Sequence, residues 1–569
     1  MKYPKKRVLS ASRQTIEVFG GYNHNDRIGD GEFYYEQNIS ADSYPVFSPR
    51  KGRSREHGKW DGQALQGLIG KDALCVAAGG KLYVNGYEYA VGLKDGIKHP
   101  VSMGAYIVFP EDRKWFNTAD GTWGQIDAEL TSGAALTPCL VSGAEITFAL
   151  VEPETPKNKE FWLDQSAEPY SLKQWSEAEG MWVAIATTYV KISMANVDKV
   201  FDLYDGVDIS AEVEKGLENV VGSNVVWAKG ENYIVVSGLI SGIADANITL
   251  ERKMPVMDHV IECGNRLWGC RYGPNSKGEV VNEIYCSKLG DFKNWHCFMG
   301  VSTDSWYGQC GTDGVFTGAI THLGFPLFFK EDVLHKVYPS TQGAHSVQDT
   351  ACRGVQAGCE KSLVIINGVL YYKSRDGVCG FDGSLPTSVS TALGNAMYFD
   401  AVAGGVGNEY YISMVDEAGE SHLFTFDTSR GIWHRQDDAK ITDFCTTRGQ
   451  LYGICGDQLL NFTRDDDGEV VCWEAQTGPM GIFTSDAKYM TGISIRAWLG
   501  MNSSMSVFTS YDLTGDWTQV ACVTGDGLRS WQLPISVRRY DHVYLKIVGM
   551  GDAKIYSITK TLEQGSDVR

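Results

Sequence analysis

Val369–Phe381 (VLYYKSRDGVCGF) has the pattern of a short β-hairpin. Two runs of β-branched and aromatic residues flank an Asp-Gly turn, and the second run ends in an aromatic residue. Asp-Gly favours tight hairpin turns, because such turns require positive φ. The stretch therefore predicts two paired strands.

The same pattern recurs along the chain, at a spacing of roughly 30 to 60 residues over its later part, which is typical of β-propeller blades. The other copies are Ala105–Trp123, Asn282–Trp295, Pro326–Tyr338, His422–Trp433 and Gln450–Phe462. One early copy and five later ones predict about six four-stranded blades. Closing such a ring requires strands from the two ends of the chain to share a blade, because free strand edges promote aggregation.

Departures from this repeat divide the chain into five segments, and the whole is predicted to be all-β. Short strands and tight turns without the repeat predict a small inserted β-barrel or knob, and alternating strands near the end predict a β-sandwich. The best helix candidate, Ser171–Gly180 (SLKQWSEAEG), is short. The segments are an extended leader (1–60), a first blade region (61–130), the inserted β module (131–250), the remaining blades (251–478) and a C-terminal β-sandwich (479–569).

Composition restricts the classes of function. Of 569 residues, 43% are hydrophobic and 21% charged, as in folded proteins, and the net charge of −19 argues against a duplex-binding protein. No stretch approaches the ~18 apolar residues of a membrane span, and the basic start lacks the apolar core of a signal peptide, so we expect synthesis in a cytoplasm. The 14 cysteines include no Cys-x-x-Cys pair, which predicts free, buried thiols.

The sequence assigns no catalytic, cofactor-binding or metal-binding residue. Asp465, Asp466 and Asp467 with Glu469 lack the spacing of an EF-hand, which favours a charged hairpin tip. Ser510–Trp517 (SYDLTGDW) partly matches the Asp box of sialidases, but its Gly is displaced, which favours an Asp turn beside a core tryptophan. His296, His335 and His542 are interpreted as packed or hydrogen-bonded residues.

Several segments resemble β-propeller virion proteins of tailed bacteriophages that infect Gram-positive hosts, of the tail-nozzle or neck-ring type. Phe19–Asn23 (FGGYN) and Tyr44–Arg53 (YPVFSPRKGR) resemble their leader. Pro255–Cys270 (PVMDHVIECGNRLWGC), continuing into Asn282–Trp295, is similar to one of their blades. Arg538–His542 (RRYDH) and Gly549–Ser557 (GMGDAKIYS) resemble their C-terminal region.

The resemblance implies a structural protein of the virion tail, made in the host cytoplasm, and no enzyme. It implies a homo-oligomeric, hexameric ring that binds other tail or neck proteins, such as an adaptor and fibres, and lets DNA pass without sequence-specific binding. About six copies would carry on the order of −100 formal charges, and an acidic lumen would repel the DNA backbone. The alternatives are a receptor- or glycan-binding tail protein, a polysaccharide-cleaving enzyme and a cellular propeller scaffold.

We expect the partner-binding parts to be the inserted module and the C-terminal sandwich, because both depart from the repeat. Within the blades, the aromatic residues that close the repeated pattern are predicted to be core residues. They are Trp123, Trp295, Tyr338, Phe381 and Trp433.

Overall fold

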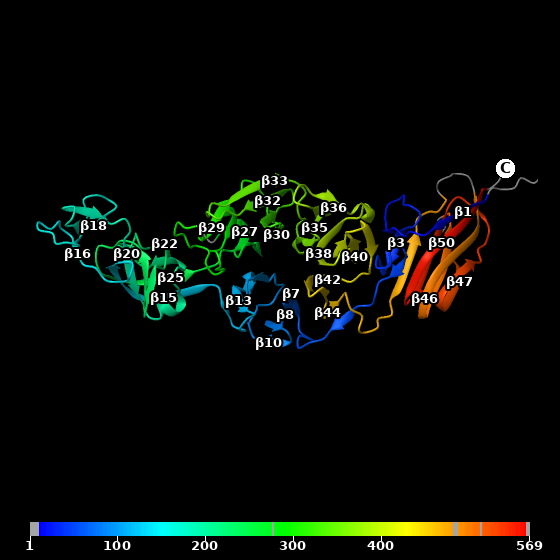
Figure 1. The fold of residues 1–569 in the computed structure, drawn as a ribbon, viewed down its shortest axis with the longest axis horizontal. Coiled ribbons are helices and arrows are strands. Elements are labelled where there is room, and N and C mark those ends of the chain that lie inside the picture. The colour runs from blue at the N-terminus through cyan, green and yellow to red at the C-terminus, as the bar shows by residue number, and fades with distance from the viewer. Residues whose placement is uncertain (1–10, 276–277, 482–487, 513–514, 565–569) are drawn as a thin grey trace, which may run out of the picture. The chain divides into compact units, whose positions relative to one another are not determined.

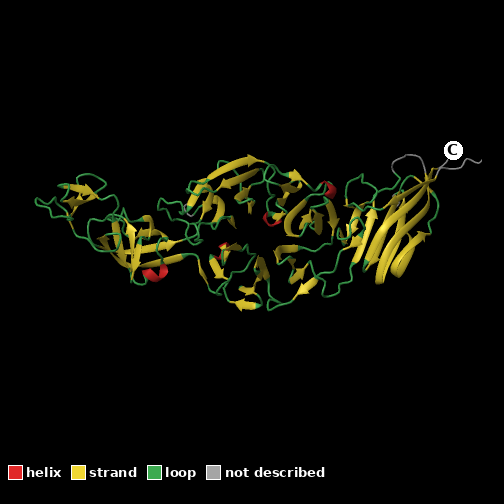
Figure 2. Ribbon diagram, in the orientation of Figure 1, coloured by secondary structure: helices red, strands yellow, loops and turns green. Residues whose placement is uncertain are grey.

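The computed structural model describes residues 11–275, 278–481, 488–512 and 515–564. The protein is all-β, and strands joined by turns make up nearly all of it (Figures 1 and 2). Within the described ranges, helical structure is limited to single turns: α1 (Val197–Val200), η1 (Pro110–Asp112), η2 (Glu360–Ser362) and η3 (Thr391–Leu393). The chain divides into two compact units. Unit 1 comprises 1–98, 329–334 and 351–569, and unit 2 comprises 99–328 and 335–350.

Seven four-stranded sheets of the described chain either contain the repeated pattern or come directly before or after such a sheet along the chain. The first two are β7 (Leu65–Lys71), β8 (Ala73–Ala78), β9 (Lys81–Val84) and β10 (Tyr87–Tyr89), then β11 (Val101–Met103), β12 (Tyr106–Phe109), β13 (Lys114–Asn117) and β14 (Trp123–Gln125). The next two are β26 (His259–Glu262), β27 (Leu267–Pro274), β28 (Val280–Cys286) and β29 (Trp306–Gln309), then β30 (Gly318–His322), β31 (Phe325–Phe329), β32 (Val333–Tyr338) and β33 (Ser346–Ala351).

The last three sheets lie in unit 1. They are β34 (Val364–Ile366), β35 (Val369–Ser374), β36 (Gly377–Phe381) and β37 (Thr387–Ser388), then β38 (Tyr398–Val406), β39 (Glu409–Asp416), β40 (Ser421–Asp427) and β41 (Ile432–Arg435), then β42 (Ile441–Thr447), β43 (Gln450–Cys455), β44 (Gln458–Asn461) and β6 (Ser54–Glu56).

The first strands of successive sheets pack against one another within each unit. In unit 1, β34 contacts β38, β38 contacts β42, and β42 contacts β7. In unit 2, β11 contacts β26, and β26 contacts β30. Such packing of innermost strands is the arrangement of propeller blades, so these sheets are consistent with a β-propeller.

The number of sheets differs from the predicted six, because the first blade region contains two sheets within 65–125. The hairpin of the first sheet, Lys81–Tyr89 (KLYVNGYEY), also ends in an aromatic residue, although its outer strand β10 has only three residues. A tight turn at Asn85-Gly86, with φ of 51° and 77°, joins β9 to β10, and Asn-Gly accepts positive φ at both positions. The prediction counted one blade where the chain has two hairpins of the same kind.

The predicted sharing of a blade by distant strands is confirmed at β6. This strand of the leader pairs with β44, placing Glu56 opposite Leu459 and Ser54 opposite Asn461. The leader was predicted to be an extended segment with few periodic features, but two more of its strands pair with strands of the C-terminal region. Its β1 (Ala11–Ile16) pairs with β50 (Ala553–Gln564), and β3 (Glu32–Gln37) pairs with β45 (Cys472–Thr477).

Two arginines of the leader anchor it to unit 1. Arg50 donates from its two terminal nitrogens to the two carboxylate oxygens of Glu469, at 3.0 and 3.1 Å. Arg53 donates to Asp437 at 2.7 Å, and its guanidinium lies 4.5 Å from the centre of the Phe462 ring. Both arginine side chains are less than 10% exposed. The stretch Pro49–Arg53 (PRKGR) therefore fastens the leader to the rest of unit 1 by pairing two buried guanidinium groups with partly exposed carboxylates.

Gly21 of the FGGYN motif has a similar structural role. Its φ is +78°, and a Cβ there would lie 2.4 Å from the carbonyl oxygen of Trp433. Only glycine allows this close approach of the leader to β41. Phe19 and Tyr22 on either side are buried, so the motif packs the leader onto the blade.

The inserted module contains a seven-stranded sheet that begins directly after β14. Its order is β22-β21-β25-β15-β20-β24-β23. The strands are β15 (Ala128–Cys139), β20 (Tyr189–Ser193), β21 (Gly206–Ala211), β22 (Gly222–Val225), β23 (Ala228–Gly230), β24 (Tyr233–Ser237) and β25 (Ala244–Arg252). Contact between β22 and β24 curls the sheet around an apolar core that includes Leu136, Ile192 and Leu250.

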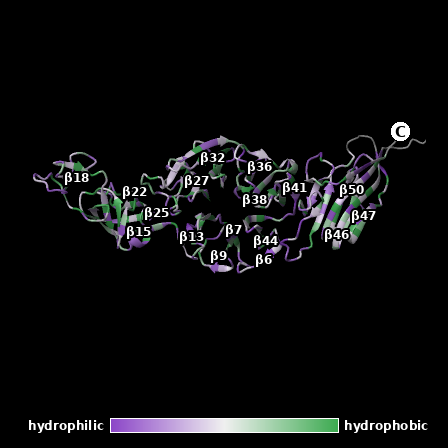
Figure 3. Cartoon of the chain, in the orientation of Figure 1, coloured by the Kyte–Doolittle hydropathy of each residue, from purple (hydrophilic) through white to green (hydrophobic). Residues whose placement is uncertain are grey.

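The C-terminal region and the leader form one nine-stranded sheet, of order β1-β50-β46-β49-β45-β3-β2, in which β47 and β48 also pair with the long strand β46 (Lys488–Tyr511). One side of β46 pairs with β48 (Arg539–Tyr540) at its start and then with β47 (Thr518–Leu533); the other pairs first with β50 and then with β49 (Val543–Met550). The register with β47 shifts between Leu499 and Ser503. Figure 3 shows hydrophobic and polar residues alternating along these strands.

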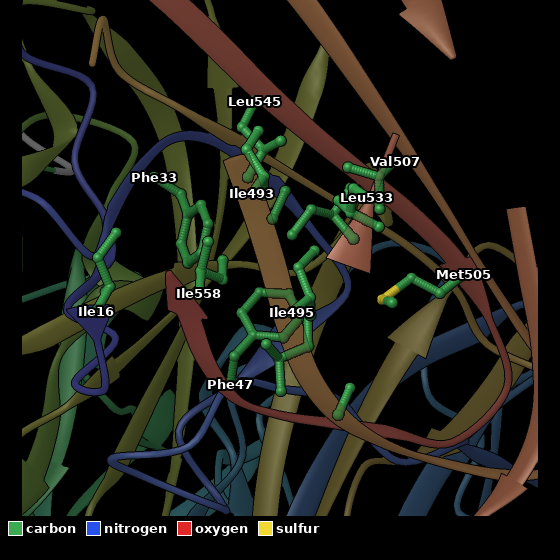
Figure 4. Close-up of a cluster of buried hydrophobic side chains, with 14 of the residues drawn as sticks. Ile16, Phe33, Phe47, Ile493, Ile495, Met505, Val507, Leu533, Leu545 and Ile558 are labelled. Carbon is green, nitrogen blue, oxygen red and sulfur yellow. The ribbon is translucent and has the colours of Figure 1, made fainter. Parts of the chain in front are cut away.

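The apolar core of this region includes side chains of the leader. Ile16, Phe33 and Phe47 pack with Ile495 and Ile558, as Figure 4 shows. All five are at most 8% exposed. The leader therefore contributes core side chains as well as strands, and this apolar burial stabilises unit 1.

The five predicted core aromatics divide into two groups. Trp295, Phe381 and Trp433 are 4%, 2% and 1% exposed, so their prediction is confirmed. Trp123 and Tyr338 are 46% and 36% exposed, so theirs is wrong. Trp123 begins β14, the edge strand of its sheet, and Tyr338 ends β32; at such positions one face of the ring has no strand above it.

Trp433→Ala should lower the free energy of unfolding of unit 1 by about 3–5 kcal/mol, because the ring is fully buried. It stacks on Phe426 at 4.8 Å, and its indole N–H donates to the Val389 carbonyl at 2.8 Å. Urea denaturation measures the change. Tyr87→Ala, at an aromatic residue of unit 1 that is 68% exposed, is the matched control and should cost less than about 1 kcal/mol. Equal losses in the two variants would contradict the burial assigned here.

Arg53→Ala should cost unit 1 about 1.5–3 kcal/mol, because it removes a charge-assisted hydrogen bond to Asp437, whose side chain is 21% exposed and keeps Arg50 at 3.5 Å. Lys51→Ala, two residues away, changes a side chain that is 79% exposed and should shift stability by no more than about 0.5 kcal/mol. Urea midpoints of the two variants, compared with wild type, provide the measurement. A small effect at Arg53 would mean that the leader is held by strand pairing alone.

Candidate functional site

A second sheet of the inserted module carries three tryptophans on one face. The sheet consists of β16 (Phe148–Ala149), β17 (Phe161–Asp164), β18 (Ser171–Ser176) and β19 (Met181–Ala184). In its register Trp162 lies opposite Lys173, and Trp175 lies opposite Trp182. Because alternate residues share a face, these four side chains lie together, and we call them the tryptophan face.

The best helix candidate of the sequence, Ser171–Gly180, forms β18 and the turn that leads to β19. The turn closes at Gly180, which has a φ of +61° and donates its N–H to the Ser176 carbonyl at 2.8 Å. The opposite face of the sheet buries Leu163 and Leu172. Strand pairing between these leucines and between the tryptophans outweighs the helix propensity of Lys, Gln, Glu and Ala.

The tryptophan rings are half-buried and pack edge to face. Trp182 lies 5.5 Å from Trp162 and 5.4 Å from Trp175, centre to centre, at interplanar angles of 60° and 70°. The Lys173 ammonium lies 5.2 Å from the centre of the Trp162 ring. Because the rings are steeply inclined to one another, they form an uneven apolar surface and not a flat platform on which a ring could stack.

One ion pair fixes the polar side of this face. Lys173 donates to Asp164 at 2.7 Å, and the Ser166 N–H donates to the same carboxylate at 3.0 Å. The hydrogen bond from Lys173, followed by those from Ser166, holds the pKa of Asp164 well below its usual range. The carboxylate therefore stays charged at neutral pH and keeps Lys173 over the Trp162 ring.

The strand β19 forms one edge of this sheet, and within the described part of the chain no further strand pairs with it. Met181 and Val183 of β19 are 55% and 40% exposed and point away from the tryptophan face. An edge strand with exposed apolar side chains on one face and tryptophans on the other is suited to contact with another protein. We therefore take β19 and the tryptophan face as the candidate functional site.

The candidate residues of the sequence are used for structure. Among Asp465, Asp467 and Glu469, Glu469 binds Arg50 and accepts from the Arg53 N–H, and Asp467 accepts from the Arg55 N–H at 2.8 Å. These carboxylates anchor the leader, which the sequence did not indicate. All 14 cysteines are free, and burial raises the pKa of Cys286 and Cys445 to about 12. No cluster of metal-ligating side chains occurs among the described residues.

His335 lies between a hydroxyl and a carboxylate. Its Nε2 is 2.9 Å from Thr312 Oγ1, and its Nδ1 is 2.6 Å from Asp349 Oδ1. Serine hydrolases use this order of groups, but the His335 side chain is fully buried, so a substrate has no access to it. His296 lies 3.4 Å from Asp208, and His542 lies 3.0 Å from Asp541. We interpret all three as residues that satisfy local hydrogen bonds.

A fourth histidine, His345, was not singled out by the sequence. Its ring packs against Trp268 and Trp306, with centroids 5.1 and 5.5 Å away. Its Nδ1 accepts a hydrogen bond from the Ser340 N–H at 2.9 Å. Burial, and then the charge of Arg266, lowers its pKa to about 4. Protonation of Nδ1 would also break the bond from Ser340.

Comparisons with known proteins identify no family. No protein-family model matches the chain, and no curated protein matches it. Among the described segments, no helix is long and apolar enough to cross a membrane.

Two solved structures similar to this chain are a galactanase and a sialidase. An exo-β-1,3-galactanase from Phanerochaete chrysosporium is 9% identical, with a TM-score of 0.22 over 54% of this chain and 96% of that one. A sialidase from Trypanosoma rangeli is 9% identical, with a TM-score of 0.20 over 98% of this chain and 97% of that one. Likenesses this distant support no argument about activity, and the architecture is established by the sheets themselves.

His345 should make unit 2 less stable as the pH falls from about 6.5 to 4, because the unfolded state binds a proton there that the folded state does not. Its contribution is complete above the unfolded pKa and should decline by about 2 kcal/mol over this range. His345→Gln keeps an acceptor for Ser340 and removes the titration. Urea midpoints from pH 7.5 to 4 should therefore fall more steeply in wild type than in this variant. Parallel curves would show that His345 is not responsible.

Proposed function

We propose that this chain is a structural protein of a bacteriophage virion, a tail-nozzle or neck-ring component without catalytic activity. In this proposal it is synthesised in the host cytoplasm and assembles as a hexameric ring with other tail proteins, such as an adaptor and fibres. The observation that carries the proposal is the candidate site, an exposed apolar edge strand and tryptophan face on a module inserted between blades.

The inclination of the tryptophan rings favours a protein as the occupant of this site. A protein neighbour can fit side chains between inclined rings, and its own backbone can pair with the edge of β19. Tryptophan and methionine are among the residues enriched in interfaces between proteins. In a ring, the occupant is the adjacent copy of this chain.

The roles of the motifs also support a scaffold. Gly21, Arg50 and Arg53 belong to the segments that resemble phage propeller proteins, and each one fastens the leader to unit 1. These motifs therefore hold the leader in place, and they bring no reactive groups together. With a net charge of −19 per copy, an assembled ring would repel DNA and let it slide through without sticking.

Native mass spectrometry of the purified protein, alone and with tail or neck proteins, tests the proposal. We expect a ring for wild type, and an at least tenfold weaker assembly when Met181→Asp and Val183→Asp are combined, because two charges would be buried at the contact. Met501→Asp, at a residue of the C-terminal region that is 77% exposed, is the matched control and should assemble normally.

Two outcomes would contradict the proposal. A wild-type monomer or trimer that never forms a larger ring, even with tail or neck proteins, would argue for receptor binding instead. Unchanged assembly of the double variant would show that the ring contact lies elsewhere. Circular dichroism of the variants confirms that they remain folded, since both replaced side chains are exposed.

A further inference from the structure

The outer face of the C-terminal sandwich, within unit 1, contains a cavity of about 390 Å³. This volume lies within the range of pockets that hold small molecules. The cavity combines aromatic and polar side chains. Its lining residues are Asp26, Tyr34, Gln476, Pro479, Ser510, Gly515, Trp517 and Tyr544.

Strand register brings these residues together from distant parts of the chain. Ser510 of β46 lies opposite Tyr544 of β49, and Gln476 of β45 lies opposite Lys546 of β49. Along β49, Val543 and Leu545 are buried, whereas Tyr544 and Lys546 are only half-buried. The polar and aromatic residues therefore occupy the face that points away from the core.

Each aromatic ring of the cavity is supported by a neighbour. The Tyr34 ring stacks on His24 at 4.2 Å, and His24 Nδ1 donates to the Tyr34 carbonyl at 2.9 Å. The Tyr544 ring packs edge-on against His542 at 5.4 Å. The Lys546 ammonium lies 4.8 Å from the centre of the Trp517 ring. The rings are thus held in place before any ligand binds, which lowers the entropy cost of binding.

Trp517 differs from its prediction as a core tryptophan. It is half-buried and faces the cavity, and the preceding Leu513 and Thr514 lie outside the described residues. The aromatic side chain is therefore available to a ligand. Asp26 is exposed, and Ser510 faces the cavity while it is only 3% exposed overall.

We propose that this cavity binds a neutral saccharide. A sugar ring presents C–H groups that pack on aromatic faces, which Tyr34, Trp517 and Tyr544 supply. Its hydroxyl groups need donors and acceptors at the rim, which Asp26, Gln476 and Ser510 supply, and within the described residues these three side chains bond to no other group. The Asp26 carboxylate and the net charge of −19 disfavour an anionic sugar.

The test uses full-length protein and three neutral probes: maltotriose, cellotriose and the trimer of N-acetylglucosamine. Saturation-transfer NMR detects binding, and calorimetric titration measures the affinity. We expect at least one probe to bind at millimolar affinity or better. Trp517→Ala and Tyr544→Ala should each weaken it at least tenfold, as loss of a stacking ring does. Asp26→Asn should weaken it by a smaller factor.

Trp123→Ala, at an exposed tryptophan of β14 that belongs to neither site, is the matched control and should bind like wild type. Tyr544→Phe keeps the ring and separates the contribution of the hydroxyl from that of stacking. Thermal midpoints of the cavity variants should stay near that of wild type, because the replaced rings are not core residues.

Failure of all three probes to bind would overturn the proposal, as would equal affinities of wild type and Trp517→Ala. Binding of sialyllactose as tight as that of the neutral probes would overturn the preference for a neutral sugar. The inference does not depend on ring assembly. Loss of assembly with sugar binding intact, or the reverse, therefore tells the two proposals apart.

Discussion

Unit 1 depends on the pairing of its leader with strands from the other end of the chain. Without β6, the strand β44 would present an unpaired edge, and without β1 and β3 the C-terminal sheet would lose two strands and the core side chains Ile16 and Phe33. Backbone groups at a free edge also invite pairing with other chains. The ion pairs of Arg50 and Arg53 also fix the orientation of the leader, because a guanidinium group donates to a carboxylate in few orientations. The same contacts therefore give unit 1 both its closure and its register.

The all-β class and the repeated hairpins were predictable, because alternation and turn dipeptides are local properties of the sequence. Trp295, Phe381 and Trp433 were predicted to be buried and are. Trp123 failed because an aromatic at the end of a hairpin is covered only if another strand lies beyond it, and β14 is an edge. The number of sheets failed for a different reason. The prediction assigned a single blade to 61–130, whereas the hairpin Lys81–Tyr89 and the one that ends at Trp123 belong to separate sheets.

The candidate sites were beyond local reasoning. Ser171–Ser176 has helix-forming residues, and only its pairing with β17 and β19 aligns the three tryptophans. The sugar cavity draws Asp26 and Tyr34 from the leader and the remaining residues from 476–544, and no local pattern brings such segments together. Sequence reasoning predicted the inserted segment as a departure from the repeat, and the tryptophan face lies within its bounds. The departure alone did not reveal which side chains would meet.

The long-range pairing of the leader also has a consequence for biosynthesis. Asn461 and Glu56 are 405 residues apart in the chain, and Thr15 and Thr559 are 544 apart. A ribosome releases the leader long before its partner strands exist, whereas the strands of unit 2 come from one central stretch of the chain. Unit 2 can thus fold during translation, while the hydrophobic residues of the nascent leader stay exposed to solvent until their partner strands are synthesised. Domains that fold in this order expose strand edges for a long time, which makes chaperone protection and a slow final step of maturation natural properties of this architecture.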